Sequence, residues 1–77
     1  MNIEKFTRVI QCHHTPETID RIIMPIRKRA MMVTSFQYAC TTATEAKCTL
    51  TFESNELEAE KIYKNMLRII DIISINR

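Results

Sequence analysis

The stretch Thr15–Phe36, TPETIDRIIMPIRKRAMMVTSF, decides the fold, because its pattern predicts an amphipathic helix that leads directly into a strand. Thr15 offers an N-cap oxygen, and Pro16 falls at the first helical position, where a backbone N–H is not needed. The apolar stripe at helical spacing consists of Ile19, Ile22, Ile23, Ile26 and Ala30. A helix with such a stripe needs a sheet to pack against.

Alternating segments on both sides of this helix predict the strands of that sheet. Residues 4–12 place Phe6, Arg8, Ile10 and Cys12 on one face and Thr7, Val9 and Gln11 on the other. Residues 31–38 place Met32, Thr34, Phe36 and Tyr38 opposite Met31, Val33, Ser35 and Gln37. A turn over residues 41–45 leads to Cys48, Leu50 and Phe52, which alternate with Lys47, Thr49 and Thr51. We expect the last two segments to form a hairpin.

A second helix follows, for which Ser54 or Asn55 can provide the N-cap. Its apolar positions are Ala59, Ile62, Tyr63 and Met66. Residues 69–75 can then form a final strand with isoleucine on both faces, a pattern that indicates burial against a partner. Alternatively, Ile69 and Ile70 close the second helix, and only the last four residues of the segment form the strand.

The resulting order, βαββαβ, predicts an α+β ferredoxin-like fold, in which one antiparallel sheet carries two helices on one face. We assign residues 1–77 to this single domain. A chain of this length buries only about 60% of the surface that its unfolded form exposes, so its core provides little stability. We therefore expect a partner to stabilise the chain.

Composition and charge exclude several classes of protein. No run approaches the roughly 20 apolar residues of a membrane-spanning helix, and the first residues lack the pattern of a targeting signal. We therefore expect a cytoplasmic protein that does not bind a membrane. The net charge of +2 indicates no strong attraction to nucleic acid. Cys12, Cys40 and Cys48 lack both CxxC spacing and the density of a disulfide scaffold, so we interpret them as small apolar residues.

Cys12, His13 and His14 form a cluster of residue types that bind zinc or act as nucleophile and base. Neighbouring residues of a strand point in opposite directions, however, and no second ligand pair occurs at metal spacing. Catalysis would also need an orienting Asp or Asn and an oxyanion turn, and neither can be assigned. We predict a surface loop here, with no metal site and no catalytic residue.

The basic run Arg27–Arg29, together with Phe36 and Tyr38, suggests RNA bases stacked on a sheet, because RNA-recognition domains share this topology. The segment Lys47–Phe52 lacks the Gly-Phe pattern of their main stacking motif. We therefore interpret the basic run as a complement to the helix dipole.

The stretch TPETIDRIIMPIRKRAMMVTSFQ, the threonine-rich turn and the closing NMLRIIDIISI together resemble the ACT domain of short acetolactate (acetohydroxyacid) synthase small subunits. The form most similar is the single-ACT subunit that accompanies the valine-insensitive isozyme. The resemblance spans nearly the whole chain. The residues that carry it are Pro16-Glu17-Thr18, Arg21, Arg27 with Arg29, and Leu67–Ile75 with its Asp71-Ile72 pair.

This resemblance implies a non-catalytic regulatory subunit of branched-chain amino-acid synthesis, which stabilises or activates a large catalytic subunit. That large subunit would carry thiamine diphosphate, FAD and magnesium, and this chain would carry no cofactor. ACT domains of this family pair side by side, so the resemblance also implies a homodimer through the sheet, whose edges are otherwise unprotected.

In valine-sensitive relatives, the effector binds at the dimer interface through an asparagine and a glycine of the loop before the first helix. The aligned residues here are His14 and Glu17, or Thr15 in place of His14 if the loop shifts by one residue. Glu17 adds bulk and a like charge near the carboxylate of an amino acid. The resemblance therefore implies insensitivity to valine. The candidate effector loop consists of His13, His14, Thr15, Pro16, Glu17 and Thr18.

Two features depart from the family pattern. Ala30 stands where relatives end the first helix with glycine, and a left-handed Ala30 would cost roughly 1 kcal/mol. Pro25 lies inside that helix, where it can cost about 3 kcal/mol unless the helix bends between Arg21 and Pro25. Both features suggest a marginally stable monomer.

Two other functions remain as alternatives. The first is a free-standing ACT module that senses another small amino acid or only self-associates. The second is an acylphosphatase-like hydrolase of the same topology, but the chain contains no glycine for the phosphate loop of such an enzyme.

Overall fold

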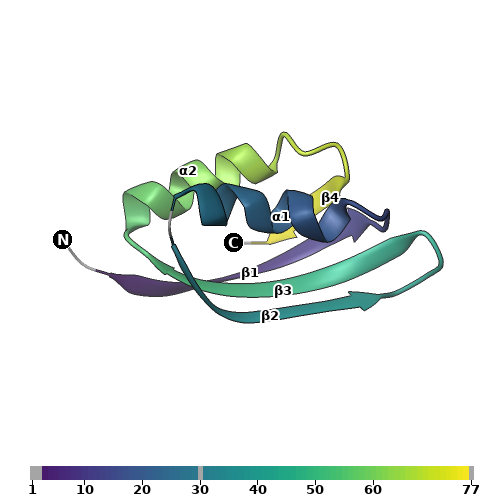
Figure 1. The fold of residues 1–77 in the computed structure, drawn as a ribbon, viewed down its shortest axis with the longest axis horizontal. Coiled ribbons are helices and arrows are strands. Elements are labelled where there is room, and N and C mark those ends of the chain that lie inside the picture. The colour runs from purple at the N-terminus through teal and green to yellow at the C-terminus, as the bar shows by residue number, and fades with distance from the viewer. Residues whose placement is uncertain (1–2, 30, 77) are drawn as a thin grey trace.

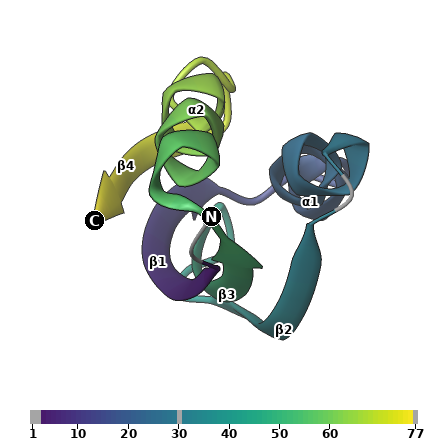
Figure 2. The ribbon, with the colours of Figure 1, turned by 90° about the vertical axis from the view of Figure 1, so that its left-hand side faces the viewer.

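The computed structural model describes residues 3–29 and 31–76. Within these residues, the elements are β1 (Glu4–His13), α1 (Thr18–Lys28), β2 (Met32–Cys40), β3 (Glu45–Ser54), α2 (Glu56–Met66) and β4 (Ile72–Asn76). The strands form one antiparallel sheet in the order β2-β3-β1-β4. Helices α1 and α2 lie on one face of this sheet (Figure 1, Figure 2). The predicted ferredoxin-like fold is confirmed.

The two faces of the sheet differ sharply in polarity. On the inner face, the alternation predicted for β3 is confirmed, because Cys48, Leu50 and Phe52 are fully buried. On the outer face, the hydroxyls of Thr7 and Thr51 lie 3.0 Å apart across the β1–β3 pair. The outer face is therefore polar, as expected for an antiparallel sheet with helices on one side.

Helix α1 begins later than predicted. It starts at Thr18 with Glu17 as its N-cap residue, whose side chain makes no cap hydrogen bond. Thr15 and Pro16 belong to a preceding turn, in which the Thr18 N–H donates to the Thr15 carbonyl O at 3.2 Å. The predicted cap at Thr15 is wrong because Glu17 is the residue that precedes the helix, and the Thr15 Oγ1 contacts the Thr18 Oγ1 at 2.9 Å and the Glu17 Oε2 at 3.4 Å.

The buried face of α1 also differs in part from the predicted stripe. Ile22 and Ile26 are fully buried, but Ile19 is 42% exposed and Thr18 occupies the inward position instead. Thr18, Ile22 and Ile26, spaced four residues apart, point toward the sheet. Ile19 therefore lies at the edge of the buried face of the helix. Ala30, the expected end of the stripe and the position of the missing glycine, lies outside the described residues.

A bulge in β2 changes the predicted alternation of that strand. Val33 pairs with Phe52 of β3 and Ser35 with Thr51, so Thr34 is the extra residue. Before the bulge the odd-numbered Val33 packs against the core, whereas after it the even-numbered Phe36 and Tyr38 do. Met32, which was predicted to share a face with Phe36, is 66% exposed. A pattern that alternates strictly with a period of two does not predict such a bulge.

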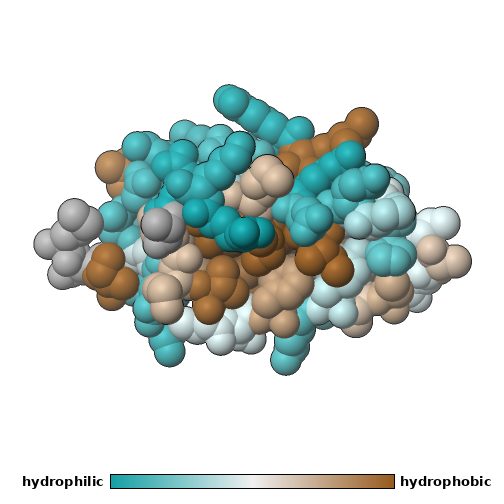
Figure 3. Space-filling view, viewed as in Figure 1, coloured by the Kyte–Doolittle hydropathy of each residue, from teal (hydrophilic) through white to brown (hydrophobic). Residues whose placement is uncertain are grey.

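The C-terminal region bears out the second interpretation for the strand, which begins at Ile72, and corrects it for the helix, which does not reach Ile69. Helix α2 ends at Met66, and the strand begins only at Ile72, so Ile69 and Ile70 belong to the connecting turn. Ile70 is 84% exposed. Figure 3 shows hydrophobic atoms over this turn, bordered by hydrophilic ones.

The start of α2 selects between the two predicted caps. Asn55 is the N-cap residue, and its side-chain oxygen accepts a hydrogen bond from the Glu58 N–H at 2.8 Å. The Ser54 hydroxyl is buried and donates to the Asn55 carbonyl O at 2.9 Å. The side-chain oxygen of Asn55 thus accepts from one of the N–H groups at the helix start that have no partner within the helix.

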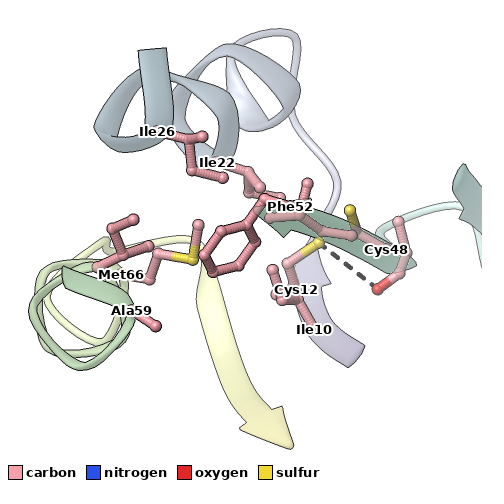
Figure 4. Packing of buried hydrophobic residues seen from close by; sticks show 11 residues of the cluster. Ile10, Cys12, Ile22, Ile26, Cys48, Phe52, Ala59 and Met66 are labelled. Atoms are coloured by element: carbon pink, nitrogen blue, oxygen red, sulfur yellow. Dashed lines mark hydrogen bonds between the residues drawn. The ribbon is translucent and has the colours of Figure 1, made fainter. Parts of the chain in front are cut away.

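The core lies between the helices and β1 and β3. Phe52 lies between Met66 and Ala59 of α2 and Ile22 of α1 (Figure 4). Cys12 is also buried, and its thiol donates to the Ala46 carbonyl O at 3.5 Å. Among the described residues, no helix is long and apolar enough to cross a membrane.

Candidate functional site

The predicted effector loop joins β1 to α1 at one end of the sheet. His13 is the last residue of β1, and Thr18 is the first residue of α1. The structure therefore keeps the six candidate residues together, with two of them in regular elements and four between. His13, His14, Pro16 and Glu17 are exposed, whereas Thr18 is fully buried.

Backbone hydrogen bonds attach this loop to two other turns. The His13 N–H donates to the Asp71 carbonyl O at 2.7 Å, in the turn before β4. The His14 N–H donates to the Thr44 carbonyl O at 2.8 Å, in the β2–β3 turn. Three turns that are far apart in the sequence therefore meet at this end of the molecule.

A cluster of hydroxyls and one carboxylate fixes the start of α1. The Thr18 Oγ1 lies 2.9 Å from the His13 carbonyl O and 2.9 Å from the Thr15 Oγ1. The Asp71 Oδ2 lies 3.3 Å from the Thr18 Oγ1 and 3.4 Å from the Thr15 Oγ1. Arg21 completes the cluster, because its Nη1 donates to the same Asp71 oxygen at 2.8 Å.

Asp71 is the electrostatic centre of this cluster, which we call the Asp71 cluster (Thr15, Thr18, Arg21 and Asp71). The Asp71 side chain is 8% exposed, and that of Arg21 is 43% exposed. A buried carboxylate requires compensating donors, and the Arg21 guanidinium supplies the shortest of them. The Thr15 and Thr18 hydroxyls lie near the same oxygen, but each has one hydrogen and another acceptor within reach. The cluster therefore holds the loop against the turn before β4.

A second contact attaches the loop to β2. The His14 Nδ1 lies 2.7 Å from the Tyr38 hydroxyl oxygen. Burial raises the pKa of Tyr38, and the neighbouring Cys12 raises it further. The pKa of the Cys12 thiol is also raised, mainly by burial. Both groups are therefore protonated at neutral pH, so Cys12 is no ready nucleophile or thiolate ligand.

The geometry also bears on the metal and RNA interpretations. Among the described residues, no group of three or more His, Cys, Asp and Glu side chains is placed to hold a metal ion. Phe36 and Tyr38 lie half-buried against the core on the helix side of the sheet, so they are not on the open face. Arg29, from the basic run, donates to Glu58 Oε1 at 3.0 Å and so links the end of α1 to α2.

Sequence reasoning did not assign roles in this site to Asp71, Tyr38 or Thr44. One signal for Asp71 was present, because it is a lone acid in the apolar run LRIIDIISI. A lone carboxylate in such a run needs a donor, but the sequence does not identify Arg21 as that donor. Tyr38 and Thr44 gave no comparable signal.

The geometry can be compared with that of known proteins. No protein-family model matches this chain, and a search of curated proteins finds no match. Among solved structures, the ACT domain from the GTP pyrophosphokinase of Chlorobium tepidum superposes with a TM-score of 0.85 at 10% identity, over 99% of both chains. The fold is that of ACT domains.

Two further solved structures superpose on this chain. The acetolactate synthase small subunit from Thermotoga maritima superposes with a TM-score of 0.80 at 11% identity, over 95% of this chain. This chain spans 46% of that subunit, which is less than half of its length. The C-terminal domain of the MgtC protein from Mycobacterium tuberculosis gives a TM-score of 0.76 at 8% identity, over 96% of this chain and 84% of that one. Identities this low establish a shared fold and leave function to be argued from the site.

Proposed function

We propose that this chain is a non-catalytic regulatory small subunit, which stabilises or activates an acetolactate synthase catalytic subunit in branched-chain amino-acid biosynthesis. The observation that carries the proposal is the Asp71 cluster. Thr18, Arg21 and Asp71 belong to the segments on which the sequence resemblance rests, and they meet in one set of hydrogen bonds. The fold of the Thermotoga maritima small subunit supports the same proposal.

We further propose that valine does not regulate this chain. The N–H groups of His13, His14 and Thr15 all donate within the chain, so a ligand carboxylate would have to displace existing partners. The exposed Glu17 carries a negative charge at the start of α1, where an amino-acid carboxylate would otherwise be favoured. These features support a loop that has a structural role.

The proposal includes a homodimer through the sheet and a cytoplasmic location. Strands β2 and β4 form the two edges of the sheet. An unpaired strand edge is a template for pairing with a second copy of the chain.

The proposal can be tested with a purified acetolactate synthase catalytic subunit. Its rate and thermal stability are measured with and without this chain, and then with valine added. We expect a higher rate or a higher melting temperature in the presence of the chain, and no change on addition of valine. A catalytic subunit that responds neither in rate nor in stability would contradict the regulatory function.

A loop variant tests the explanation for valine. The double substitution His14→Asn with Glu17→Gly restores the residue types of valine-sensitive relatives and removes the charge near the ligand carboxylate. We expect valine to raise the melting temperature of this variant and to leave the wild-type chain unchanged. Glu17→Gln with His14 retained is the matched control, because it removes the charge and keeps the bulk. Valine binding by the wild-type chain would contradict the explanation.

A second candidate function is a free-standing ACT module that senses another amino acid. The observation in its favour is the match to the ACT domain from the GTP pyrophosphokinase of Chlorobium tepidum, because it shows that the same fold occurs in a protein other than an acetolactate synthase subunit. Tight binding of another amino acid by the purified chain, together with no effect on the catalytic subunit, would favour this second function.

A further inference from the structure

An open groove lies between α1 and the turn that joins α2 to β4. Its volume is about 520 Å³. Met24 and Pro25 line it from α1, and Ile70 lines it from the turn. The groove is on the helix side of the molecule, where α1 and the turn after α2 both lie (Figure 1).

The apolar lining is unusually accessible to water. Ile70 is 84% exposed and Met24 is 49% exposed. Covering side chains of this size removes apolar surface from water, which stabilises a complex. Neighbouring exposed Ile and Met side chains in a concave surface are typical of a docking site.

The charged lining has a single sign. Arg21, Lys28 and Arg68 line the groove, and among the described residues that line it there is no carboxylate. Arg21 uses one nitrogen for Asp71, yet 43% of its side chain remains exposed. Arg27 and Lys28 line a second depression beside Met24, which extends the positive surface along α1.

We propose that this groove docks a protein segment whose apolar side chains are flanked by carboxylates. The apolar residues would cover Met24 and Ile70, and the carboxylates would face Lys28 and Arg68. An amphipathic helix that lies in a groove is a common form of such recognition. This proposal rests on the proposed function, under which the segment belongs to the acetolactate synthase catalytic subunit.

Charge complementarity argues against a second copy of this chain as the occupant. A symmetric contact through the groove would bring Arg21, Lys28 and Arg68 against their own copies. Like charges at an interface cost several kcal/mol when they are desolvated, by general estimates. A homodimer is therefore better formed through the sheet edges.

The shape of the groove argues against a small molecule or a membrane as the occupant. Small-ligand sites enclose about 70–90% of the ligand surface, and this groove is open to solvent. A membrane-bound helix presents a convex apolar face, whereas Met24 and Ile70 line a concave surface between two elements. A convex protein segment fits this shape best.

The test measures binding of the chain to a purified acetolactate synthase catalytic subunit. The groove variants are the charge reversal Arg68→Glu and the polar substitution Ile70→Ser. Lys47→Glu, at an exposed position of the outer sheet face, is the matched control for charge. Leu57→Ser, at a 67% exposed position at the start of α2, is the matched control for apolar surface. All four positions are exposed, so the variants are expected to fold, which circular dichroism verifies.

We expect each groove variant to weaken binding by on the order of tenfold or more, and each control to bind within about twofold of the wild-type chain. High salt should reduce the affinity of the wild-type chain and should have less effect on Arg68→Glu. Equal binding by groove variants and controls would overturn the groove proposal and leave the proposed function intact. A wild-type chain that does not bind the catalytic subunit would overturn both proposals.

Two additional measurements examine the other occupants. The chain is mixed with vesicles of phosphatidylglycerol and phosphatidylcholine, and its mass in solution is measured for wild type and Ile70→Ser. Vesicle binding that is lost in the groove variants would overturn the proposal in favour of a membrane surface. A wild-type oligomer that dissociates in Ile70→Ser would overturn it in favour of a second copy. Absence of both effects supports the proposal.

Discussion

At the scale of single residues, Asp71 determines how the β1–α1 loop is held. Its carboxylate accepts from Arg21 at 2.8 Å and lies next to two threonine hydroxyls. Asp71→Asn removes the charge and keeps the size of the side chain. We expect a loss of about 2 kcal/mol in the free energy of unfolding, because hydrogen bonds to buried charges contribute about this much and the exposed Arg21 limits the effect. Urea denaturation measures this loss.

Two observations make the Asp71 test specific. Glu4→Gln is the control, because Glu4 is an exposed carboxylate at the start of β1 and should change stability little. Hydrogen exchange at the His13 amide should accelerate in Asp71→Asn, since that N–H donates to the Asp71 backbone. If Asp71→Asn is as stable as Glu4→Gln, the carboxylate does not hold the loop.

The cysteines give a second prediction at the residue scale. Cys40 is exposed, whereas Cys12 and Cys48 are buried. Burial raises the pKa of the Cys48 thiol to about 12, and the nearby Cys12 contributes a smaller increase. A thiol reagent at about pH 8 should therefore modify Cys40 rapidly and reach the buried thiols only after unfolding. In Cys40→Ser the rapid phase should be absent, and a rapid phase that persists would show that the core opens readily.

At the scale of elements, Glu58 connects α1 to α2. Its carboxylate accepts from Arg29 at 3.0 Å and lies 3.3 Å from the Lys61 Nζ. The hydrogen bond from Lys61, followed by Arg29, lowers the pKa of Glu58 below its ordinary value of 4.5. The folded chain thus binds fewer protons at this group than the unfolded chain, so the stabilisation is present above about pH 4.5 and is lost as the pH falls through the lowered pKa.

The lowered pKa of Glu58 predicts how the stability of the chain depends on pH. Glu58→Gln should be less stable than the wild-type chain at about pH 6, and the difference should shrink at about pH 3. Urea denaturation at the two pH values measures the difference, and Arg29→Gln should reproduce part of it. A difference that is the same at both values would mean that the Glu58 charge does not contribute to stability.

The sequence predicts elements well where packing follows one regular period. In β3, alternating residues from Ala46 to Phe52 all face the core, because successive side chains of a strand point to opposite faces and the helices cover only one of them. The prediction fails at Thr34, where a bulge in β2 shifts the register, and at Thr15, whose backbone N–H bonds to a hydroxyl three residues later. Bulges and local hydrogen bonds of this kind depend on tertiary contacts, which override local preference.

The candidate site is predictable in location and not in its contacts. The position of the loop followed from the βαββαβ order, whereas the contact of Thr15 with Asp71 joins residues 56 positions apart. Similarly, the contact of His14 with Tyr38 depends on how β2 lies beside the loop. A single sequence carries no information on such long-range pairs beyond the requirement that a buried carboxylate finds a donor.

At the scale of the whole molecule, stability should depend on association. A chain of 77 residues can bury only a small core, and the edge strand β2 pairs on one side only, with β3, over residues Met32–Cys40. Strand β4, with five residues, offers a shorter edge than β2. Pairing of β2 with a second copy would extend the sheet and add backbone hydrogen bonds that the monomer lacks.

The proposed pairing would make the melting temperature a function of chain concentration. Because only the folded chain pairs, mass action stabilises a dimer by about 1.4 kcal/mol for each tenfold rise in concentration. We expect the melting temperature, followed by circular dichroism, to rise over a range of roughly a hundredfold in concentration, with a dimer in sedimentation at the upper end. A melting temperature that does not depend on concentration, with a monomer at every concentration, would contradict pairing through the sheet.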